Sequence, residues 1–248
     1  MNKLKIIPIA ALVFCAVALT ACEVNINIGD NVRGSGDVKT EDRPISGVTG
    51  VALSTVGELS IEMGDQESLR VEAEDNLLQY FETTVQGGVL TIETVPDVGI
   101  RTTKPVRYYL VVKSLESIEV SSSGNVSAGM LTGMRLTVRI SSSGDVRLAG
   151  LEAESLEVRL SSSGKLTIDG GSVQNQEVRL SSSGDYDGSA LRSASARVDV
   201  TSSGSATIWV TDLLDGNLSS SGDLEYYGSP QVSVDTSSSG DVRSLGNR

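Results

Sequence analysis

The four residues Ser121-Ser122-Ser123-Gly124 recur down the second half of the chain at a regular spacing. Each copy ends in a glycine, and one copy begins with threonine instead of serine: Gly124, Gly144, Gly164, Gly184, Gly204, Gly222 and Gly240. Four intervals between these glycines are 20 residues long, and the last two are 18. A repeat this short cannot bury an apolar face alone, so consecutive repeats must stack into a continuous core. The spacing therefore predicts a solenoid.

Three columns of apolar residues keep a constant phase relative to these glycines. They lie six and four residues before each glycine and two residues after it, as Ile118, Val120 and Val126 do in the first copy. Side chains alternate along a strand, so the three columns face the interior together. We therefore predict an all-β fold, a single-stranded parallel β-helix (β-solenoid) of about 20 residues per coil. Parallel connections are normally right-handed, and the length from Gly36 to Gly240 predicts nine or ten coils.

Two conformations of the repeated phrase fit this pattern. If strand alternation continues through it, the middle serine (Ser122 in the first copy) and the glycine face inward. A narrow coil needs small side chains there, and the hydroxyls can hydrogen-bond along the ladder. Alternatively, each glycine adopts a positive φ at a corner, and the next residue starts a new strand. We favour a bend at the glycine, and in either case the outer serines form two exposed hydroxyl columns.

The first residues have the features of a secretory signal. Two lysines give a basic start, and the apolar segment 6–19 is too short to span a membrane as a helix. It ends in Leu19-Thr20-Ala21-Cys22, which resembles the lipobox of bacterial lipoproteins. That resemblance implies cleavage between Ala21 and Cys22 and a diacylglycerol group on the Cys22 sulfur, which anchors the chain to a membrane. Cys15 lies in the removed segment, so the mature chain is expected to have no disulfide.

The repeat pattern divides the chain into three parts. Residues 1–21 form the lipoprotein signal peptide, and residues 22–43 form the lipidated amino terminus and a tether, or already contain the first coil. Residues 44–248 form the β-solenoid head domain, with irregular amino-terminal coils or a cap in 44–118 and the regular repeats in 119–248. We expect a cap because the end of a solenoid exposes unpaired strand edges.

Three local signals mark the irregular part. The segment from Val51 to Ile61 fits the repeat, with apolar residues at the same positions around Gly57. Gly87-Gly88 lies between two strand-like segments and predicts a two-residue hairpin turn. Residues 76–81 predict a helical turn or a packed loop.

The composition excludes several classes of function. The chain has 32 acidic and 20 basic residues, which argues against a nucleic-acid partner. It contains no histidine, the commonest general base and metal ligand, and only 4% aromatic residues. Aspartates follow several phrase glycines, but Lys165 and Ser205 interrupt that column, which argues against a calcium site. We predict no catalytic residue, no metal and no cofactor.

Two outward-facing sets of residues are candidate ligand surfaces, and the first is basic. Arg139, Arg159 and Arg179 lie five residues before consecutive glycines and stack in one column. Stacked arginines repel one another unless an anion or nearby carboxylates compensate their charge. Glu157 and Glu177 lie two residues before two of these arginines. We therefore favour ion pairs within the surface over a site for an anionic polysaccharide.

The second set is aromatic. Trp209 and Tyr227 both stand five residues after a phrase glycine, in consecutive coils, and Tyr226 precedes Tyr227. These rings fit either a packed corner of the coil, which we favour, or a platform that stacks on a sugar ring. The exposed serine columns are a further candidate surface for ice, sugar or another repeat, although serine is also an ordinary solubilising residue there.

The sequence resembles a bacterial family, the auto-transporter adhesin head domain called the GIN domain, over most of its length. The resemblance rests on Arg43-Pro-Ile-Ser-Gly-Val-Thr-Gly50, on Ala73-Glu-Asp-Asn-Leu-Leu78, on Pro105-Val-Arg-Tyr-Tyr109 and on the recurring strand followed by Ser-Ser-Ser-Gly-Asp. The family usually has Ser-Gly-Ser-Gly in the phrase, so this chain adds hydroxyls without changing the period. The resemblance implies an extracytoplasmic, single-domain β-solenoid without an established activity.

These observations predict a non-catalytic, lipid-anchored protein on the extracytoplasmic face of the cell envelope, with a role in adhesion, binding or envelope structure. Its expected partners are the membrane, through the lipid on Cys22, and a glycan or a cell-surface protein. Its oligomeric state stays open. The alternative is a carbohydrate-active enzyme, a lyase or hydrolase on a β-helix, that works with carboxylates and basic groups alone. A minor alternative is an ice-binding surface.

Overall fold

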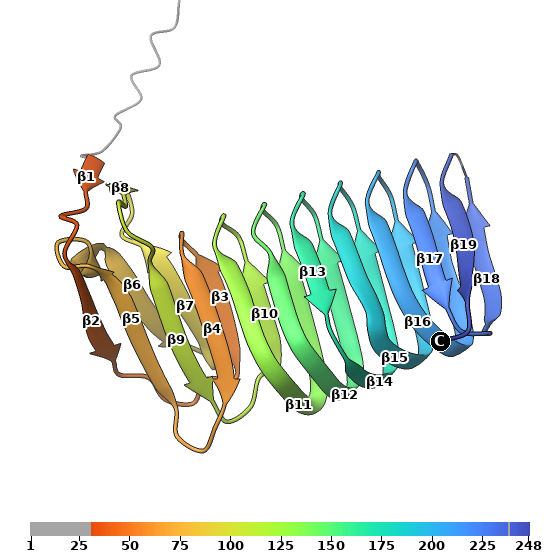
Figure 1. The fold of residues 1–248 in the computed structure, drawn as a ribbon, viewed down its shortest axis with the longest axis horizontal. Helices are drawn as coiled ribbons and strands as arrows, with labels where there is room; N and C mark the ends of the chain where they lie inside the picture. The colour runs from red at the N-terminus through yellow and green to blue at the C-terminus, as the bar shows by residue number, and fades with distance from the viewer. Residues whose placement is uncertain (1–30, 238) are drawn as a thin grey trace, which may run out of the picture.

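The structure, a computed structural model, describes residues 31–237 and 239–248 and shows a parallel β-solenoid of about six turns (Figure 1). The predicted signal peptide, its cleavage site after Ala21 and the lipidation site Cys22 lie outside the described residues. Within them, no helix has the length and apolar character that a membrane crossing requires. The all-β, parallel fold with a period of about 20 residues is confirmed.

Each regular coil consists of two runs of strand joined by the Ser-Ser-Ser-Gly phrase, and the phrases form the row of tips along the upper edge of Figure 1. The long strands continue around the opposite, rounded edge of the coil. The strands of this part are β10 (Ser117–Val120), β11 (Asn125–Ile140), β12 (Val146–Leu160), β13 (Lys165–Ile168), β14 (Gly171–Leu180), β15 (Asp185–Val200), β16 (Ser205–Leu218), β17 (Asp223–Tyr227), β18 (Gln231–Thr236) and β19 (Asp241–Gly246).

Neighbouring coils pair in parallel with the predicted register. Ile118 is opposite Val138, and Val138 is opposite Val158, as a shift of 20 residues requires. The three apolar columns are buried through the regular coils and form one continuous core. In the last coil, Val234 and Val242 occupy the same columns but are only partly buried, because nothing among the described residues stacks on them.

The amino-terminal part is built differently. Its elements are β1 (Asn31–Arg33), β2 (Val38–Arg43), β3 (Gly50–Ser54), β4 (Glu58–Met63), β5 (Ser68–Glu74), the 3₁₀ turn η1 (Leu78–Tyr80), β6 (Phe81–Gln86), β7 (Val89–Thr94), β8 (Gly99–Arg101) and β9 (Arg107–Val112). β3 and β4 form the first regular coil, since they pair in parallel with β10 and β11. β7 and β9 add one parallel layer, and β2, β5 and β6 close this end with antiparallel pairs.

Two predictions for this part are wrong. The segment around Gly36 does not begin a coil, because β2 pairs antiparallel with β5. Residues 65–118 contribute one stacked layer and a cap instead of 20-residue repeats, so the regular repeats from Gly124 to Gly240 make about six turns, fewer than the nine or ten predicted from Gly36. The hairpin prediction is confirmed, since Gly87 and Gly88 join β6 to β7 with φ values of 58° and 82°.

The repeated glycines serve a close approach of backbones, and the predicted positive φ at these positions is wrong. None of the seven phrase glycines is among the residues with positive φ. A Cβ on Gly144 would lie 2.2 Å from the carbonyl oxygen of Gly124 and 2.9 Å from that of Ser122. A Cβ on Gly164 would lie 2.4 Å from the carbonyl oxygen of Gly144. The phrase of one coil thus rests directly on the phrase of the coil before it.

The middle serines satisfy carbonyl groups at this contact. The Ser122 hydroxyl donates to the Thr55 carbonyl at 2.5 Å, and the Ser142 hydroxyl donates to the Ser122 carbonyl one coil back. In a later coil the Ser220 hydroxyl donates to the Thr201 carbonyl at 3.2 Å. The predicted hydrogen bonds along the ladder are therefore confirmed, with backbone oxygens as the acceptors.

A buried carboxylate joins the amino-terminal segment to the cap. Glu74, at the end of β5, accepts hydrogen bonds from the backbone N–H groups of Gly36 at 2.7 Å and Thr103 at 2.8 Å, and from the Thr103 hydroxyl at 2.5 Å. Burial acts to raise the pKa of this carboxyl, but the donors outweigh burial and hold the pKa below its ordinary value. The adjacent Asp75 accepts a hydrogen bond from the Ser35 hydroxyl at 2.7 Å. These bonds fasten the chain where it enters the solenoid.

Candidate binding surface

Outward side chains on the run before each phrase form a charged face across β11, β12, β14, β15 and β16. Strand alternation places them outside because the residues between them fill the core. The charged face has three columns whose members are opposite one another on neighbouring strands: Arg135, Ser155, Asn175, Ser195 and Leu213; Thr137, Glu157, Glu177, Arg197 and Asp215; and Arg139, Arg159, Arg179, Asp199 and Asn217.

The three arginines predicted as a candidate site lie in one column, and two of them form ion pairs. Arg159 contacts Glu157 at 2.5 Å, and Arg179 contacts Glu177 in the same way one coil further on. The interpretation of ion pairs within the surface is confirmed for these two arginines. Arg139 stands between Arg159 and Glu119 in the ladder. The column therefore contains three successive arginines, two of which are compensated by carboxylates of the neighbouring column.

A second cluster of charges continues this pattern on the next strands. Arg197 reaches Asp199 at 3.1 Å and Asp215 at 2.5 Å. The negative charges of these carboxylates, that of Asp199 above all, raise the pKa of Arg197 above its ordinary value. The positive charge on this part of the charged face is thus balanced by its neighbours.

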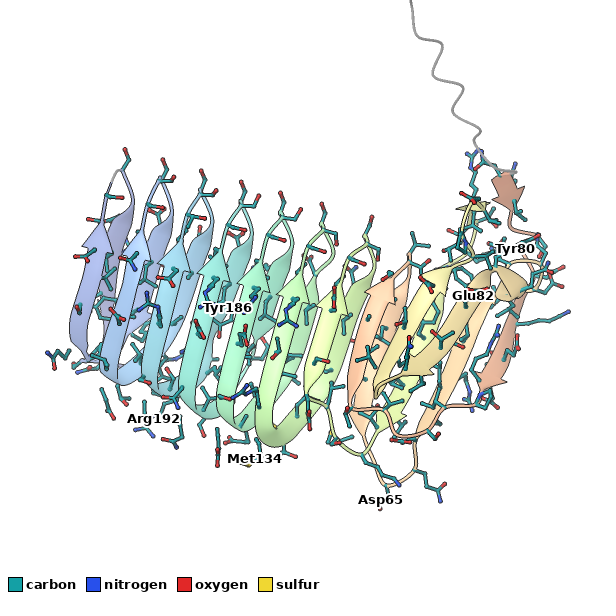
Figure 2. The ribbon with its side chains drawn as sticks, turned by 180° about the vertical axis from the view of Figure 1, so that it is seen from behind. Asp65, Tyr80, Glu82, Met134, Tyr186 and Arg192 are labelled. Carbon is teal, nitrogen blue, oxygen red and sulfur yellow. The ribbon has the colours of Figure 1, made fainter. Side chains whose placement is uncertain are left out.

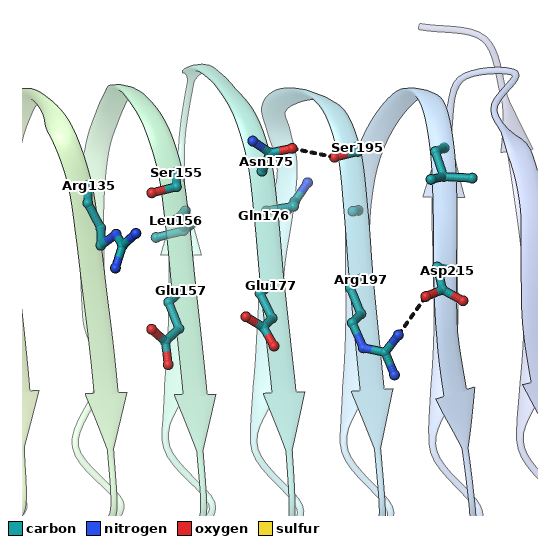
Figure 3. Close-up of a pocket in the computed structure, with 12 residues that line it drawn as sticks. Arg135, Ser155, Leu156, Glu157, Asn175, Gln176, Glu177, Ser195, Arg197 and Asp215 are labelled. Carbon is teal, nitrogen blue, oxygen red and sulfur yellow. Dashed lines mark hydrogen bonds and ion pairs between the residues drawn. The ribbon is translucent and has the colours of Figure 1, made fainter.

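A shallow groove of about 400 Å³ lies between the first two columns of the charged face (Figure 3). Small side chains such as Ser155 and Ser195 form one side of the groove, and Glu177 and Arg197 are on the other. The Ser195 hydroxyl donates to the Asn175 side-chain oxygen of the neighbouring coil at 2.6 Å. Because the groove crosses several coils, its hydrogen-bonding groups repeat at the strand spacing of about 4.8 Å.

A buried polar network supports the floor of the groove, and the sequence reasoning missed it. Tyr186, inside the coil (Figure 2), donates its hydroxyl to the Gln176 side-chain oxygen at 3.0 Å. The Gln176 amide donates to the Ser193 hydroxyl at 2.7 Å, which donates to the Trp209 carbonyl at 2.9 Å. Burial raises the pKa of the Tyr186 hydroxyl. The signal in the sequence was the polar Gln176 opposite the buried Leu156.

The aromatic candidates do not form one platform. Trp209 and Tyr227 are opposite each other on β16 and β17, and the Arg248 guanidinium lies 6.0 Å and 5.4 Å from their ring centres. Tyr226 packs against the core instead. This arrangement supports the packed-corner interpretation. Trp209 and Tyr227 lie on the strands that follow the Ser-Ser-Ser-Gly phrase, whereas the arginine column lies on the strands that precede it. The aromatic pair and Arg159 are therefore on different runs of the coil.

The sequence profile of one family matches residues 47–230, which are 184 of the 248 residues. The family is described as "Putative auto-transporter adhesin, head GIN domain". The chain belongs to this family. Its GIN domain includes the first regular coil, most of the cap and the coils up to β17. The comparison with curated proteins gives no match for this GIN-domain chain.

Solved structures share the fold of this GIN domain. A putative adhesin from Bacteroides fragilis has a TM-score of 0.80 and 20% identity, and the match covers 86% of this chain and all of the other. A putative lipid binding protein from Parabacteroides distasonis has a TM-score of 0.72 and 22% identity over 87% of this chain and all of its own. A putative adhesin from Parabacteroides merdae has a TM-score of 0.71 and 19% identity over 88% of this chain and all of its own. At these identities the likeness establishes the fold of the GIN domain alone.

Proposed function

We propose that this GIN-domain protein is a non-catalytic, lipid-anchored binding protein that acts in adhesion on the extracytoplasmic face of the cell envelope. The groove on the charged face carries the proposal, because it offers hydroxyl, amide and charged groups on consecutive coils. Similar structures described as putative adhesins and as a putative lipid binding protein support a binding role. The anchoring rests on the lipobox-like residues 19–22.

The chemistry of the groove favours an extended polymer rich in hydroxyl groups, such as a glycan. The side chains of Ser155, Asn175 and Ser195 can each donate and accept hydrogen bonds. The charges of Glu177 and Arg197 are already compensated by neighbours, so a strongly charged polymer gains little from them. A chain lying along the groove meets a similar polar group on each coil, whereas a chain lying across it meets only one or two.

A carbohydrate-active enzyme is the weaker candidate. Glycoside hydrolysis uses one carboxyl group as an acid and a second one as a base or nucleophile. Glu157 and Glu177 are neighbouring carboxylates in the groove, but each is already engaged in an ion pair with an arginine of the same strand. An ice-binding surface gains no support either. The exposed serines belong to the phrases, which form a narrow row of tips (Figure 1) and not a flat face that could match ice.

The test is a glycan array probed with the full chain, followed by dissociation constants for each glycan that binds. Ser195→Trp fills the groove from a half-buried position at its side, and Ser163→Trp places the same ring on an exposed tip as the control. We expect Ser195→Trp to weaken binding by about tenfold or more and the control to leave it unchanged. Equal affinity for both variants would locate the ligand elsewhere. Release of shortened glycan would support a carbohydrate-active enzyme. The absence of detectable binding to every glycan on the array would contradict the proposal.

A further inference from the structure

The two ends of the solenoid differ in the protection of their strand edges. β2 and β6 are the edge strands at the amino-terminal end; β6 has one charged residue, Glu82, and four of the six residues of β2 are charged: Lys39, Glu41, Asp42 and Arg43. Charges on an edge strand hinder pairing with other chains. At the opposite end, β18 pairs with β16, and β19 pairs with β17, and their outer edges have no strand beside them among residues 31–237 and 239–248. Only one of the six residues of β18 is charged.

The open edge of the last coil presents both backbone donors and apolar side chains. Ser237 donates its backbone N–H to the Leu218 carbonyl one coil back. Donors along a parallel strand point alternately to its two sides, so the N–H groups of Val234 and Thr236 point away from β16, toward the open side. Val232 on the same strand is exposed. The last coil therefore has the features of a sheet edge that can accept another strand.

We propose that the last coil pairs with the last coil of a second copy of this chain, so that two solenoids join end to end through β18 and β19. A two-fold axis parallel to the strands sets β18 of each copy antiparallel to β19 of the other. Both strand pairs then form at once, and the inner columns of the two cores meet. A single extended peptide would cover only one of the two edges. A second copy is the partner whose coil has the matching cross-section.

The position of the tether leaves this end free. β1 lies at the opposite end of the solenoid (Figure 1). Seven strand pairings separate β3 from β18, which corresponds to about 34 Å. The nine residue-to-residue steps from Cys22 to Asn31 span about 30 Å at most. An anchored chain therefore presents its last coil away from the membrane. The anchoring and the adhesive role are taken from the proposed function, on which the inference rests here. The inference adds that adhesion is a contact between copies of this chain on two facing membranes.

Two pairs of matched variants of the full chain test the pairing. Thr236→Pro removes an outward N–H and leaves the bond from Ser237 in place, whereas Thr236→Val keeps the N–H. Val232→Lys places a charge on the open edge. Val38→Lys is its control on the far end, since the two valines have similar exposures of 42% and 43%. Sedimentation velocity in detergent measures self-association, and light scattering measures the clustering of liposomes that carry the protein.

We expect the unaltered chain to dimerise and to cluster liposomes. By symmetry Thr236→Pro removes two hydrogen bonds per dimer, so the dissociation constant should rise by about tenfold to a hundredfold. Val232→Lys should act in the same direction, and both controls should behave like the unaltered chain. A chain that stays monomeric, or a Thr236→Pro variant that pairs as well as Thr236→Val, would overturn the inference. The groove is unchanged in all four variants, so a failure of glycan binding bears on the proposed function and not on the pairing.

Discussion

Replacing Gly164 by alanine should destabilise the solenoid far more than the same change at Gly129. The new Cβ at position 164 would meet the carbonyl oxygens of Gly144 at 2.4 Å and of Ser142 at 2.8 Å, and a methyl group of Ile140 at 2.6 Å. At Gly129, which lies within β11, no atom comes within 4 Å of the new Cβ. Neither glycine has a positive φ, so the comparison isolates the contact between coils.

The magnitude follows from the distances. Ordinary van der Waals contact begins at 3.4 Å, so the phrases of two coils must separate by roughly 1 Å to admit the methyl group. Overpacking costs about 1–3 kcal/mol, and we expect the upper value because backbone oxygens cannot rotate away. Gly129→Ala should instead stabilise by about 0.4–1 kcal/mol, because it restricts the unfolded chain. A loss of about 3 kcal/mol lowers the Tm by roughly 6–12 °C in a chain of this size.

Equilibrium urea unfolding, followed by far-ultraviolet circular dichroism, measures this difference in the free energy of unfolding. Repeat proteins can fray from their ends, and fraying would appear as a change in the slope of the transition. Hydrogen exchange would then locate the coils that open. Equal midpoints for Gly164→Ala and Gly129→Ala would refute the role of the phrase glycines as backbone contacts.

Three further predictions concern single groups. The pKa of Glu74 is lowered in the folded protein, so its carboxylate stabilises the fold fully above the ordinary pKa of 4.5, and this stabilisation is lost as the pH falls below that value. Hydrogen exchange of the β2 amides should therefore become faster at low pH. Glu74→Gln should remove this pH dependence. Gln176→Leu leaves the buried Tyr186 hydroxyl without its acceptor and should cost about 1–3 kcal/mol in urea unfolding, a loss that adding Tyr186→Phe should reduce. Arg248→Ala uncovers the single tryptophan, Trp209, so its fluorescence should change and stability should fall by about 0.5–1 kcal/mol; an unchanged spectrum would contradict the contact.

The regular part of the fold could be predicted from the sequence because one constraint governs every coil. A shift of 20 residues places Val138 on Ile118 and repeats the same burial each time. The conformation of the phrase could not be predicted, because a tight backbone contact and a positive φ both require glycine at positions such as Gly144. A cap is expected from the sequence, but its antiparallel strand pairing could not be predicted. Alternation in β5 is the same for parallel and antiparallel partners, and its pairing with β2 and β9 bridges long stretches of chain.

The charged face could be predicted only in part. The period alone places Arg159 and Arg179 in one column, and the glutamates two residues earlier predict their ion pairs. The groove depends on differences between coils, such as small serines beside long side chains, which a shared repeat does not reveal. The bond between Tyr186 and Gln176 crosses the interior between the two runs of the coil. Arg248 lies far along the sequence from Trp209, and no period relates the two residues.

The attachment of β2 to β5 has a mechanical consequence. This antiparallel ladder begins with the pair of Val38 and Glu74. In a chain anchored at its amino-terminal end, tension enters through the residues before β2 and pulls on the ladder from that side. A ladder loaded at one end peels open one pair at a time, and this needs less force than shearing all pairs together. The hydrogen bond from Gly36 to Glu74 lies where peeling would start. In an anchored chain this carboxylate therefore strengthens the point at which tension enters the head, and protonation of Glu74 weakens it.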